Sequence, residues 1–212
     1  MVQYQDLGLI DVVFAHKGTM GQIQSWQSLV QVCRRWRDLV FAAPRRLNLQ
    51  LYYNPRGYTR NIHTLDVWPV VIPLLIHGYV HETSVDNVIT ELGHSDRIHQ
   101  ISLEFFTNLQ IENLWTAMQV PFPELAILRL SRIGFSHVPV LPDSFLQLGG
   151  SAPCLRYISL DSIPFLGLPN LLLSTTHLVR LDLRNIPHSG YISPDTMATC
   201  LFMLSSLEAL SA

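Results

Sequence analysis

The sequence contains few charged residues. Charged side chains make up 14% of its 212 residues, against about 25% in an ordinary soluble domain. Lys17 is the only lysine, and the formal net charge is −2. Neither a basic run nor a block of like charge occurs, which argues against a nucleic-acid-binding surface and against a charged tail. Hydrophobic residues make up 48% of the chain, so we expect a large buried core or a surface that a partner covers.

Cysteine is scarce as well. Cys33, Cys154 and Cys200 lie far apart, without a Cys-x-x-Cys pair. An odd number of cysteines at no framework spacing predicts reduced thiols and an intracellular protein. No secretory signal is visible, because Asp6 and Asp11 interrupt the apolar N-terminal stretch. The most apolar segment, residues 67–80, is too short to span a bilayer and contains two prolines, so we interpret it as buried rather than as a membrane anchor.

The motifs of common enzyme sites are missing too. No glycine-rich loop suited to phosphate occurs, and residues 149–152 lack the G-x-S-x-G turn that exposes a serine nucleophile. His77 and His81 stand four residues apart, but Glu82 follows the second histidine, whereas zinc proteases carry the glutamate after the first. We therefore expect no enzyme activity, no cofactor and no metal site.

Residues 25–44 have the periodicity of one amphipathic helix. Apolar side chains recur at steps of three and four residues, at Trp26, Leu29, Cys33, Trp36 and Val40. Ser25 suits the N-cap, and Pro44 ends the helix because its ring cannot continue the hydrogen-bond ladder. The spacing predicts a single helix with these five side chains on its buried face. Periodicity alone indicates an ordinary core helix.

A second pattern, L-x-x-L-x-L, recurs through the C-terminal half. Its copies are Ile98–Leu103, Leu125–Leu130, Leu155–Leu160, Leu178–Leu183 and an incomplete Leu207–Ala212. The middle apolar residues are 27, 30, 23 and 29 residues apart, near the period of leucine-rich repeats, about 20–29 residues. Runs of helical character separate the copies, at 111–119, 142–148, 168–174 and 193–204. Strand and helix in alternation predict an irregular α/β solenoid, with a parallel sheet on its concave face and helices on its convex face.

The remaining segments give a provisional domain organisation. Alternating residues predict strands at 47–51 and 64–68, and helical spacing predicts a helix at 84–93. We expect an N-terminal part and connector at 1–24, a helical part at 25–46, a linking region at 47–97 and repeats at 98–212. The unfinished fifth copy suggests C-terminal truncation, or an end that a partner or a second copy covers.

The concave face of such a solenoid is the expected binding surface. In each strand the apolar residues point into the core, and alternation places the others on the opposite face. These residues are Gln100, Ser102, Glu104, Ile127, Arg129, Ser131, Tyr157, Ser159, Asp161, Arg180, Asp182 and Arg184. We predict that six of them bind a protein substrate: Arg129, Tyr157, Asp161, Arg180, Asp182 and Arg184. A solvated sheet face without a ligand is the alternative.

The run from Leu29 to Val40 resembles the second half of an F-box, in which a leucine precedes Val-Cys-x-x-Trp and a further leucine follows. The continuation from Phe41 to Leu51 is similar to the join between F-box and leucine-rich repeats in fungal F-box proteins. The first half departs from the F-box pattern. Gln5-Asp6 stand where Leu-Pro is expected, and Gly8 stands where Glu is expected. The connector between the halves is also longer than usual.

The resemblance implies a substrate-recognition subunit of an SCF-type (cullin-RING) ubiquitin ligase in the cytoplasm or nucleus. The F-box would bind a Skp-type adaptor, and the repeats would bind a protein substrate of unknown identity. The positions carried over as adaptor-binding residues are Leu29, Val32, Cys33, Trp36 and Leu39. The alternative is a leucine-rich-repeat interaction scaffold whose F-box is non-functional. Neither interpretation requires nucleic acid, a membrane or a cofactor.

Overall fold

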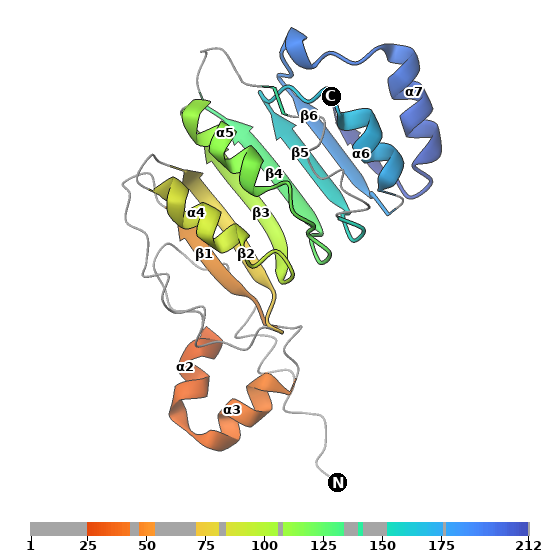
Figure 1. The fold of residues 1–212 in the computed structure, drawn as a ribbon. Helices are drawn as coiled ribbons and strands as arrows, with labels where there is room; N and C mark the ends of the chain where they lie inside the picture. The colour runs from red at the N-terminus through yellow and green to blue at the C-terminus, as the bar shows by residue number, and fades with distance from the viewer. Residues whose placement is uncertain are drawn as a thin grey trace. The chain divides into compact units, whose positions relative to one another are not determined.

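In the computed structural model of this protein, the chain divides into two compact units (Figure 1). Met1–Leu49 with Trp68–Pro73 form the helical unit, and Gln50–Val67 with Leu74–Ala212 form the sheet unit. The residues that the structure describes are 25–42, 47–53, 71–80, 84–105, 108–133, 140–141, 152–175 and 177–211. Among these residues, no helix is long and apolar enough to cross a bilayer.

The helical unit contains two short helices where the sequence predicts one long helix. α2 spans Ser25–Val32 and α3 spans Arg34–Phe41. Cys33 separates them with an extended backbone, at φ −159° and ψ 168°. The prediction of a single helix from 25 to 44 is therefore wrong, and the continuous buried stripe that it required does not form.

Local interactions stabilise this break. Val30 and Val32 are β-branched and lose side-chain freedom in a helix, which lowers the cost of ending α2 there. The last carbonyl groups of any helix lack partners within it, and Arg37 Nε of α3 donates to the Val30 carbonyl oxygen at 3.1 Å. The Cys33 carbonyl accepts from Arg37 N at 3.1 Å and so opens α3. One arginine thus closes the first helix and begins the second.

The sheet unit is built on a seven-stranded parallel sheet in which each strand lies beside its predecessor, in the order β1 to β7. The strands are β1 (Leu49–Tyr53), β2 (Leu74–Val80), β3 (Ile98–Phe105), β4 (Ile127–Arg132), β5 (Tyr157–Asp161), β6 (Arg180–Arg184) and β7 (Ala209–Ser211). Sequential parallel strands need a crossover after each strand. This topology is consistent with an α/β solenoid, which has one strand in each repeated unit.

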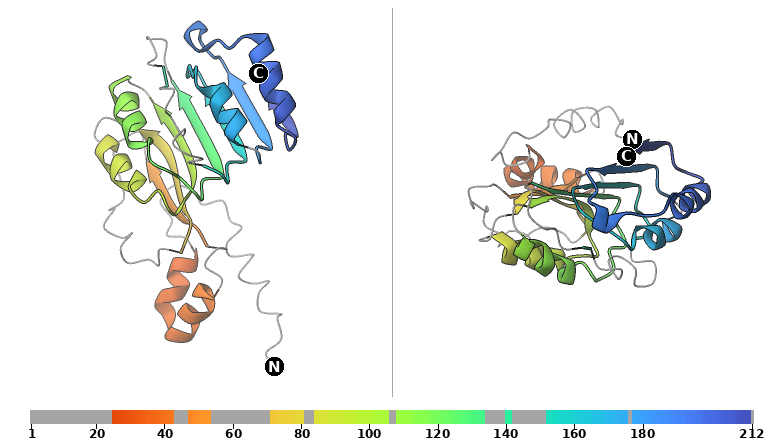
Figure 2. Two further views of the ribbon diagram at one scale, coloured as in Figure 1. Left: turned by 45° about the vertical axis from the view of Figure 1, so that its right-hand side comes forward. Right: turned by 90° about the horizontal axis from the view of Figure 1, so that it is seen from above.

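The helices of the sheet unit lie on one side of the sheet, as Figure 2 shows. They are α4 (Val85–Leu92), α5 (Asn108–Ala117), α6 (Leu168–Ser174) and α7 (Pro194–Met203), with a short 3₁₀ turn at His188–Gly190. α7 begins where the sequence predicts, because Ser193 Oγ accepts from Thr196 N at 3.2 Å and Pro194 occupies the first turn. The predicted strand at 64–68 and the predicted helix at 142–148 lie outside the described residues.

Apolar columns beneath the strands form the core. The first residue of each of the four complete L-x-x-L-x-L copies is fully buried, and the two later apolar positions are at most 8% exposed. Each such side chain contributes about 1.5–3 kcal/mol through burial. The five motifs predicted to be strands become β3 to β7, so the repeating pattern is confirmed as a ladder of parallel strands.

β2 belongs to the same ladder, although the sequence predicts only a buried segment at 67–80. Ile76 is in register with Ile101, and Gly78 is in register with Leu103. Gly78 has φ +125°, and a Cβ there would overlap the backbone carbonyl of Tyr53. Only glycine adopts this backbone while β1 passes so closely. A glycine in a leucine position hides this copy from a search for the motif.

Candidate binding surfaces

Polar side chains on the side of the sheet away from α4–α7 form a regular array, which we call the polar face. It comprises the twelve β3–β6 residues that the sequence predicts to share one side. Their register gives three rows: Gln100, Ile127, Tyr157 and Arg180; Ser102, Arg129, Ser159 and Asp182; Glu104, Ser131, Asp161 and Arg184. Strand alternation therefore places all six predicted substrate-binding residues on one continuous surface.

The members of the polar face differ in exposure. Arg129, Arg180 and Arg184 are exposed, whereas Tyr157 and Asp161 are half-buried. Asp182 is only 2% exposed. The arginines are therefore available to a partner, while the Asp182 carboxylate belongs to the internal structure of the face.

Tyr157 organises two of these arginines. The guanidinium carbon of Arg129 lies 4.5 Å from the centroid of the Tyr157 ring, and that of Arg180 lies 5.3 Å from it. Cation–π contacts of this kind contribute about 0.5–1 kcal/mol at exposed sites. A guanidinium group over an aromatic ring can still donate hydrogen bonds to a partner. Among the described residues, no carboxylate forms an ion pair with either arginine.

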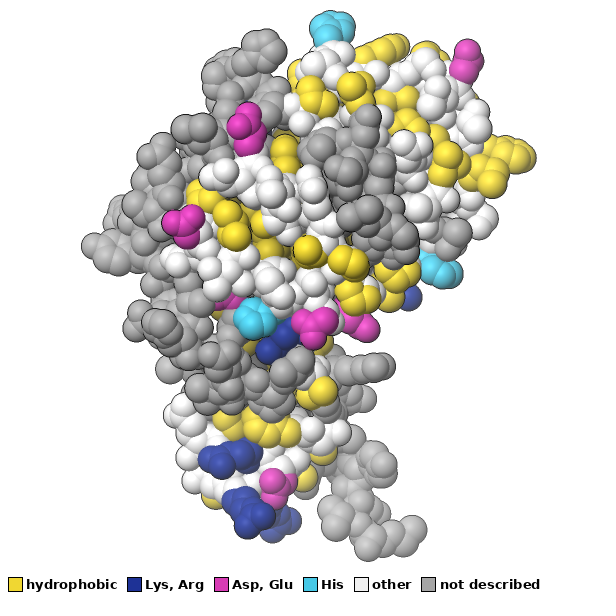
Figure 3. Space-filling model, viewed as in Figure 1, with side chains coloured by type: hydrophobic (Ala, Val, Ile, Leu, Met, Phe, Trp, Pro, Cys, Tyr) yellow, Lys and Arg dark blue, Asp and Glu magenta, His cyan; other side chains and the backbone are white. Residues whose placement is uncertain are grey.

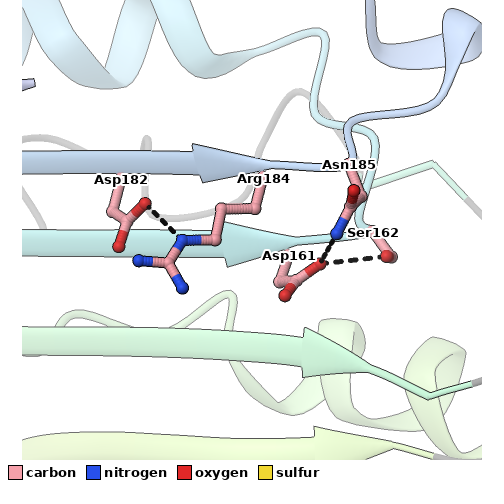
Figure 4. A network of polar contacts seen from close by, with 5 residues as sticks. All are labelled: Asp161, Ser162, Asp182, Arg184 and Asn185. Carbon is pink, nitrogen blue, oxygen red and sulfur yellow. Dashed lines mark hydrogen bonds and ion pairs between the residues drawn. The ribbon is translucent and has the colours of Figure 1, made fainter. Parts of the chain in front are cut away.

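A polar network at the ends of β5 and β6 fixes the other charged residues of the face (Figure 4). Arg184 Nε donates to Asp182 Oδ1 at 3.0 Å, which compensates the buried carboxylate. Asp161 Oδ1 accepts from Ser162 Oγ and from Asn185 Nδ2, each at 3.0 Å. Ser162 and Asn185 both have positive φ, at 59° and 50°, so equivalent turns follow the two strands and supply the donors.

Two hollows lie on the polar face. The basic hollow, about 420 Å³, is lined by His99, Ala126, Ile127, Arg129, Arg156, Tyr157, Val179 and Arg180. The mixed hollow, about 230 Å³, is lined by Ser102, Leu103, Glu104, Arg129, Leu130, Ser131, Ser159, Asp161 and Arg184. The first contains three arginines and no carboxylate. The second contains two carboxylates, two arginines and three serine hydroxyl groups.

Two neighbouring strands extend this surface beyond the residues that the sequence singles out. In register, His77 of β2 follows Ser102, and Tyr79 follows Glu104. The His77 ring packs edge-on against Tyr52 of β1, with centroids 5.2 Å apart, and burial lowers the pKa of His77. Sequence reasoning missed these aromatic residues because β2 was not recognised as a strand. With β2 recognised as a strand, the three rows of the polar face would have predicted the positions of His77 and Tyr79.

A buried polar cluster lies elsewhere in the sheet unit. Tyr53 of β1 is 2% exposed, Glu91 of α4 is 0% exposed and Arg97 is 6% exposed. Burial, and secondarily the charge of Glu91, raises the pKa of Tyr53. Burial also lowers the pKa of Arg97. Because all three side chains are enclosed, this cluster belongs to the core and presents no surface to a ligand.

The predicted adaptor-binding residues of the helical unit are mostly exposed. Val32, Trp36 and Leu39 have 67%, 46% and 57% of their surface exposed. Cys33 is exposed too, and Leu29 is half-buried. The sequence predicts Cys33 and Trp36 on a buried helix face, and this is wrong, because the break at Cys33 turns α3 away from the direction that one continuous helix would give it. Val30 of α2 and Val40 of α3 are buried, at 4% and 3% exposure.

A further apolar region lies on the helix side of the sheet unit. Leu173 of α6 is 49% exposed, and Phe202 and Met203 of α7 are 87% and 60% exposed. Figure 3 shows apolar side chains gathered over α6 and α7. Residues of this kind commonly mark contacts with further protein when they are contiguous.

The histidine pair considered for zinc does not gain a helical arrangement. His77 lies in strand β2, and His81 lies outside the described residues. Among the described residues, no three His, Cys, Asp or Glu side chains converge as metal ligands would. No protein-family model and no curated protein matches this chain.

Proposed function

We propose that this protein is the substrate-recognition subunit of an SCF-type ubiquitin ligase, with a divergent F-box in the helical unit and leucine-rich repeats in the sheet unit. The observation that carries the proposal is the exposure of Val32, Trp36 and Leu39. Large apolar side chains in a short helical segment are normally buried in a hydrophobic core. Here they remain available within the run whose sequence resembles an F-box.

The sheet unit supports the second half of the proposal. Its parallel strands carry L-x-x-L-x-L copies with the apolar residues buried. Repeat solenoids of this kind bind partners along an extended face. The polar face offers charged and aromatic side chains over four strands, and aromatic residues and arginine are the side chains that most often dominate protein interfaces.

Such a protein needs no active site of its own. A receptor that holds a target beside a ubiquitin-charged enzyme raises the local concentration of the target, and this effective concentration accelerates transfer. The residues of this chain would contribute binding and orientation. The proposal therefore places the functional residues on two surfaces, one for the adaptor and one for the substrate.

Capture of a purified Skp-type adaptor by the immobilised full chain tests the proposal. We expect the wild-type protein to retain the adaptor and Trp36→Ala to lose most of it, because exposed tryptophans at interfaces are often worth 2 kcal/mol or more. Tyr191→Ala is the matched control, since Tyr191 is a 67% exposed aromatic residue of the sheet unit. Equal retention by both variants, with unchanged circular dichroism, would contradict the assignment of the adaptor surface.

A specific observation favours a second function, a repeat scaffold whose F-box no longer binds an adaptor. The extended backbone at Cys33 interrupts the segment that best resembles an F-box. The break makes the spacing between Leu29 and Trp36 differ from that of one helix. A folded wild-type chain that retains no adaptor would support the scaffold, with the polar face as its proposed binding surface.

A further inference from the structure

The two hollows of the polar face differ in charge. The start of the strands carries the basic hollow, with Arg129, Arg156 and Arg180 and with His99 at its edge. The His99 ring is within 3.2 Å of the Glu124 backbone oxygen through Nδ1. Glu124 and Glu208 belong to the turns before β4 and β7, and neither lines the hollow. This end of the face is therefore an electropositive recess that favours the binding of an anionic group.

The two carboxylates of the mixed hollow lie at the other end of the strands. Glu104 is half-buried and has no hydrogen-bond or ion-pair partner among the described residues. Burial raises its pKa, as expected for a carboxylate that has lost water and gained no cation. Asp161 engages Oδ1 with Ser162 and Asn185, while Arg184 is engaged with Asp182. Arg129 and Arg184 also line this hollow, but their guanidinium groups are engaged with Tyr157 and Asp182. A cation that entered the hollow would therefore meet two carboxylates that neither arginine pairs with.

Tyr157 separates the charges of Arg129 and Glu104. Arg129 and Glu104 lie on adjacent strands and are diagonal neighbours, a separation of about 7–8 Å that long side chains can bridge. They form no ion pair, because the Arg129 guanidinium is stacked on the Tyr157 ring at 4.5 Å. The ring therefore keeps the Arg129 guanidinium apart from the Glu104 carboxylate.

The strand geometry sets the distance between the two ends. Tyr157 at the basic hollow and Asp161 at the mixed hollow are four residues apart on β5. Four residues of a parallel strand span about 13 Å. An extended peptide that follows the strand direction covers the same distance in four residues, so its side chains at positions i and i+4 reach the two hollows from one side.

We propose that the polar face recognises an extended peptide segment in which an acidic side chain and a lysine or arginine are four residues apart. The acidic side chain binds Arg129, Arg156 and Arg180 in the basic hollow. The basic side chain binds Glu104 and Asp161 in the mixed hollow. This names the substrate class of the proposed receptor, and it rests on the assignment of this face as the substrate surface.

The test uses short fluorescent Gly/Ser peptides that carry one glutamate and one lysine, with anisotropy measured at low ionic strength. Peptides with the two charges two, four or seven positions apart are compared, in both chain orders. We expect the four-residue spacing to bind most tightly in one of the two orders. Replacing either charged residue of that peptide by glutamine should weaken binding about threefold to tenfold.

Variants of the full chain assign each charge to its hollow. Glu104→Gln should weaken binding of the glutamate–lysine peptide and leave binding of the glutamate–glutamine peptide unchanged. Arg180→Gln should weaken binding of both of these peptides and leave binding of the glutamine–lysine peptide unchanged. A general loss of folding cannot produce this selectivity, because each variant is compared with itself across peptides.

A second pair of variants tests the role of the ring. Tyr157→Leu changes no charge, but it frees Arg129 to pair with Glu104. We expect it to lower affinity for the glutamate–lysine peptide about as much as losing one of the peptide's charges. Tyr157→Phe retains the stacking surface and should bind like the wild type.

The outcomes separate this inference from the proposed function, because adaptor capture is measured on the same preparations. Adaptor capture together with peptides that bind independently of spacing, or that do not bind at all at millimolar concentration, overturns the mixed-charge assignment alone. Spacing-selective peptide binding without adaptor capture supports the mixed-charge face and overturns the ligase role. Equal effects of Glu104→Gln on the lysine and glutamine peptides would also overturn the inference.

Discussion

Two leucines at equivalent positions of neighbouring strands have opposite surroundings, and this predicts very different costs of truncation. Leu181 of β6 is in register with Leu210 of β7. Leu181 is 0% exposed, whereas Leu210 is 49% exposed. In the other complete copies the corresponding residues, Ile101, Leu128 and Ile158, are at most 1% exposed. Leu210 is therefore the member of this apolar column that has no cover.

The expected magnitudes follow from burial. Leu181→Ala removes a fully enclosed side chain and leaves a cavity between β6 and the helices, which costs about 2–5 kcal/mol in the free energy of unfolding. Leu210→Ala removes a side chain that is half in water. It forfeits about half of the transfer free energy and encloses no cavity, so we expect a loss of about 1 kcal/mol or less.

Urea unfolding followed by circular dichroism measures both values. The midpoint should shift in Leu181→Ala while the slope stays constant, because the surface exposed on unfolding is almost unchanged. An equal loss in Leu210→Ala would refute the reasoning, since it would mean that Leu210 is covered in solution. A midpoint that rises with protein concentration would then identify a second copy as the cover.

Three further perturbations have defined outcomes. Gly78→Ala forces a Cβ into the neighbouring strand at positive φ and should cost about 3 kcal/mol or more in urea unfolding, whereas Gly93→Ala, at φ −60°, should cost about 1 kcal/mol or less. Arg184→Ala leaves the buried Asp182 carboxylate without its cation and should lower the free energy of unfolding by about 1–2 kcal/mol. This value is smaller than for a fully buried pair because the Arg184 side chain is 58% exposed. A loss below a few tenths of a kcal/mol would contradict the pairing. Burial lowers the pKa of His77, so below pH 6.5 the unfolded chain binds a proton at this residue more readily than the folded chain does. Stability should therefore fall as the pH drops below 6.5. His77→Gln should remove that component of the pH profile of stability.

The sequence predicted the sheet well because its signal is redundant. Leucine spacing in Leu125–Leu130, Leu155–Leu160 and Leu178–Leu183 recurs with the same alternation, and each copy buries its apolar residues. Alternation also predicted which side chains share the polar face. The structure shows in addition that Tyr157 contacts arginines from both neighbouring strands, which no single strand reveals.

The failures have local causes. The helix predicted from 25 to 44 assumed that regular spacing implies an unbroken backbone, but spacing does not detect one extended residue at Cys33. The sequence did not predict β2 as a strand, because Gly78 replaces the leucine that the motif requires. Both features depend on contacts between segments, Arg37 with Val30 in the first case and β1 with β2 in the second. Patterns within one segment do not record such contacts.

The affinity of the full chain for a purified Skp-type adaptor tests the central claim most directly. Calorimetry would give the dissociation constant of the wild type and of Trp36→Ala. The account predicts micromolar or tighter binding that weakens about 30-fold in the variant, which corresponds to about 2 kcal/mol. An adaptor that does not bind a folded wild-type chain, or that binds both proteins equally, would contradict it.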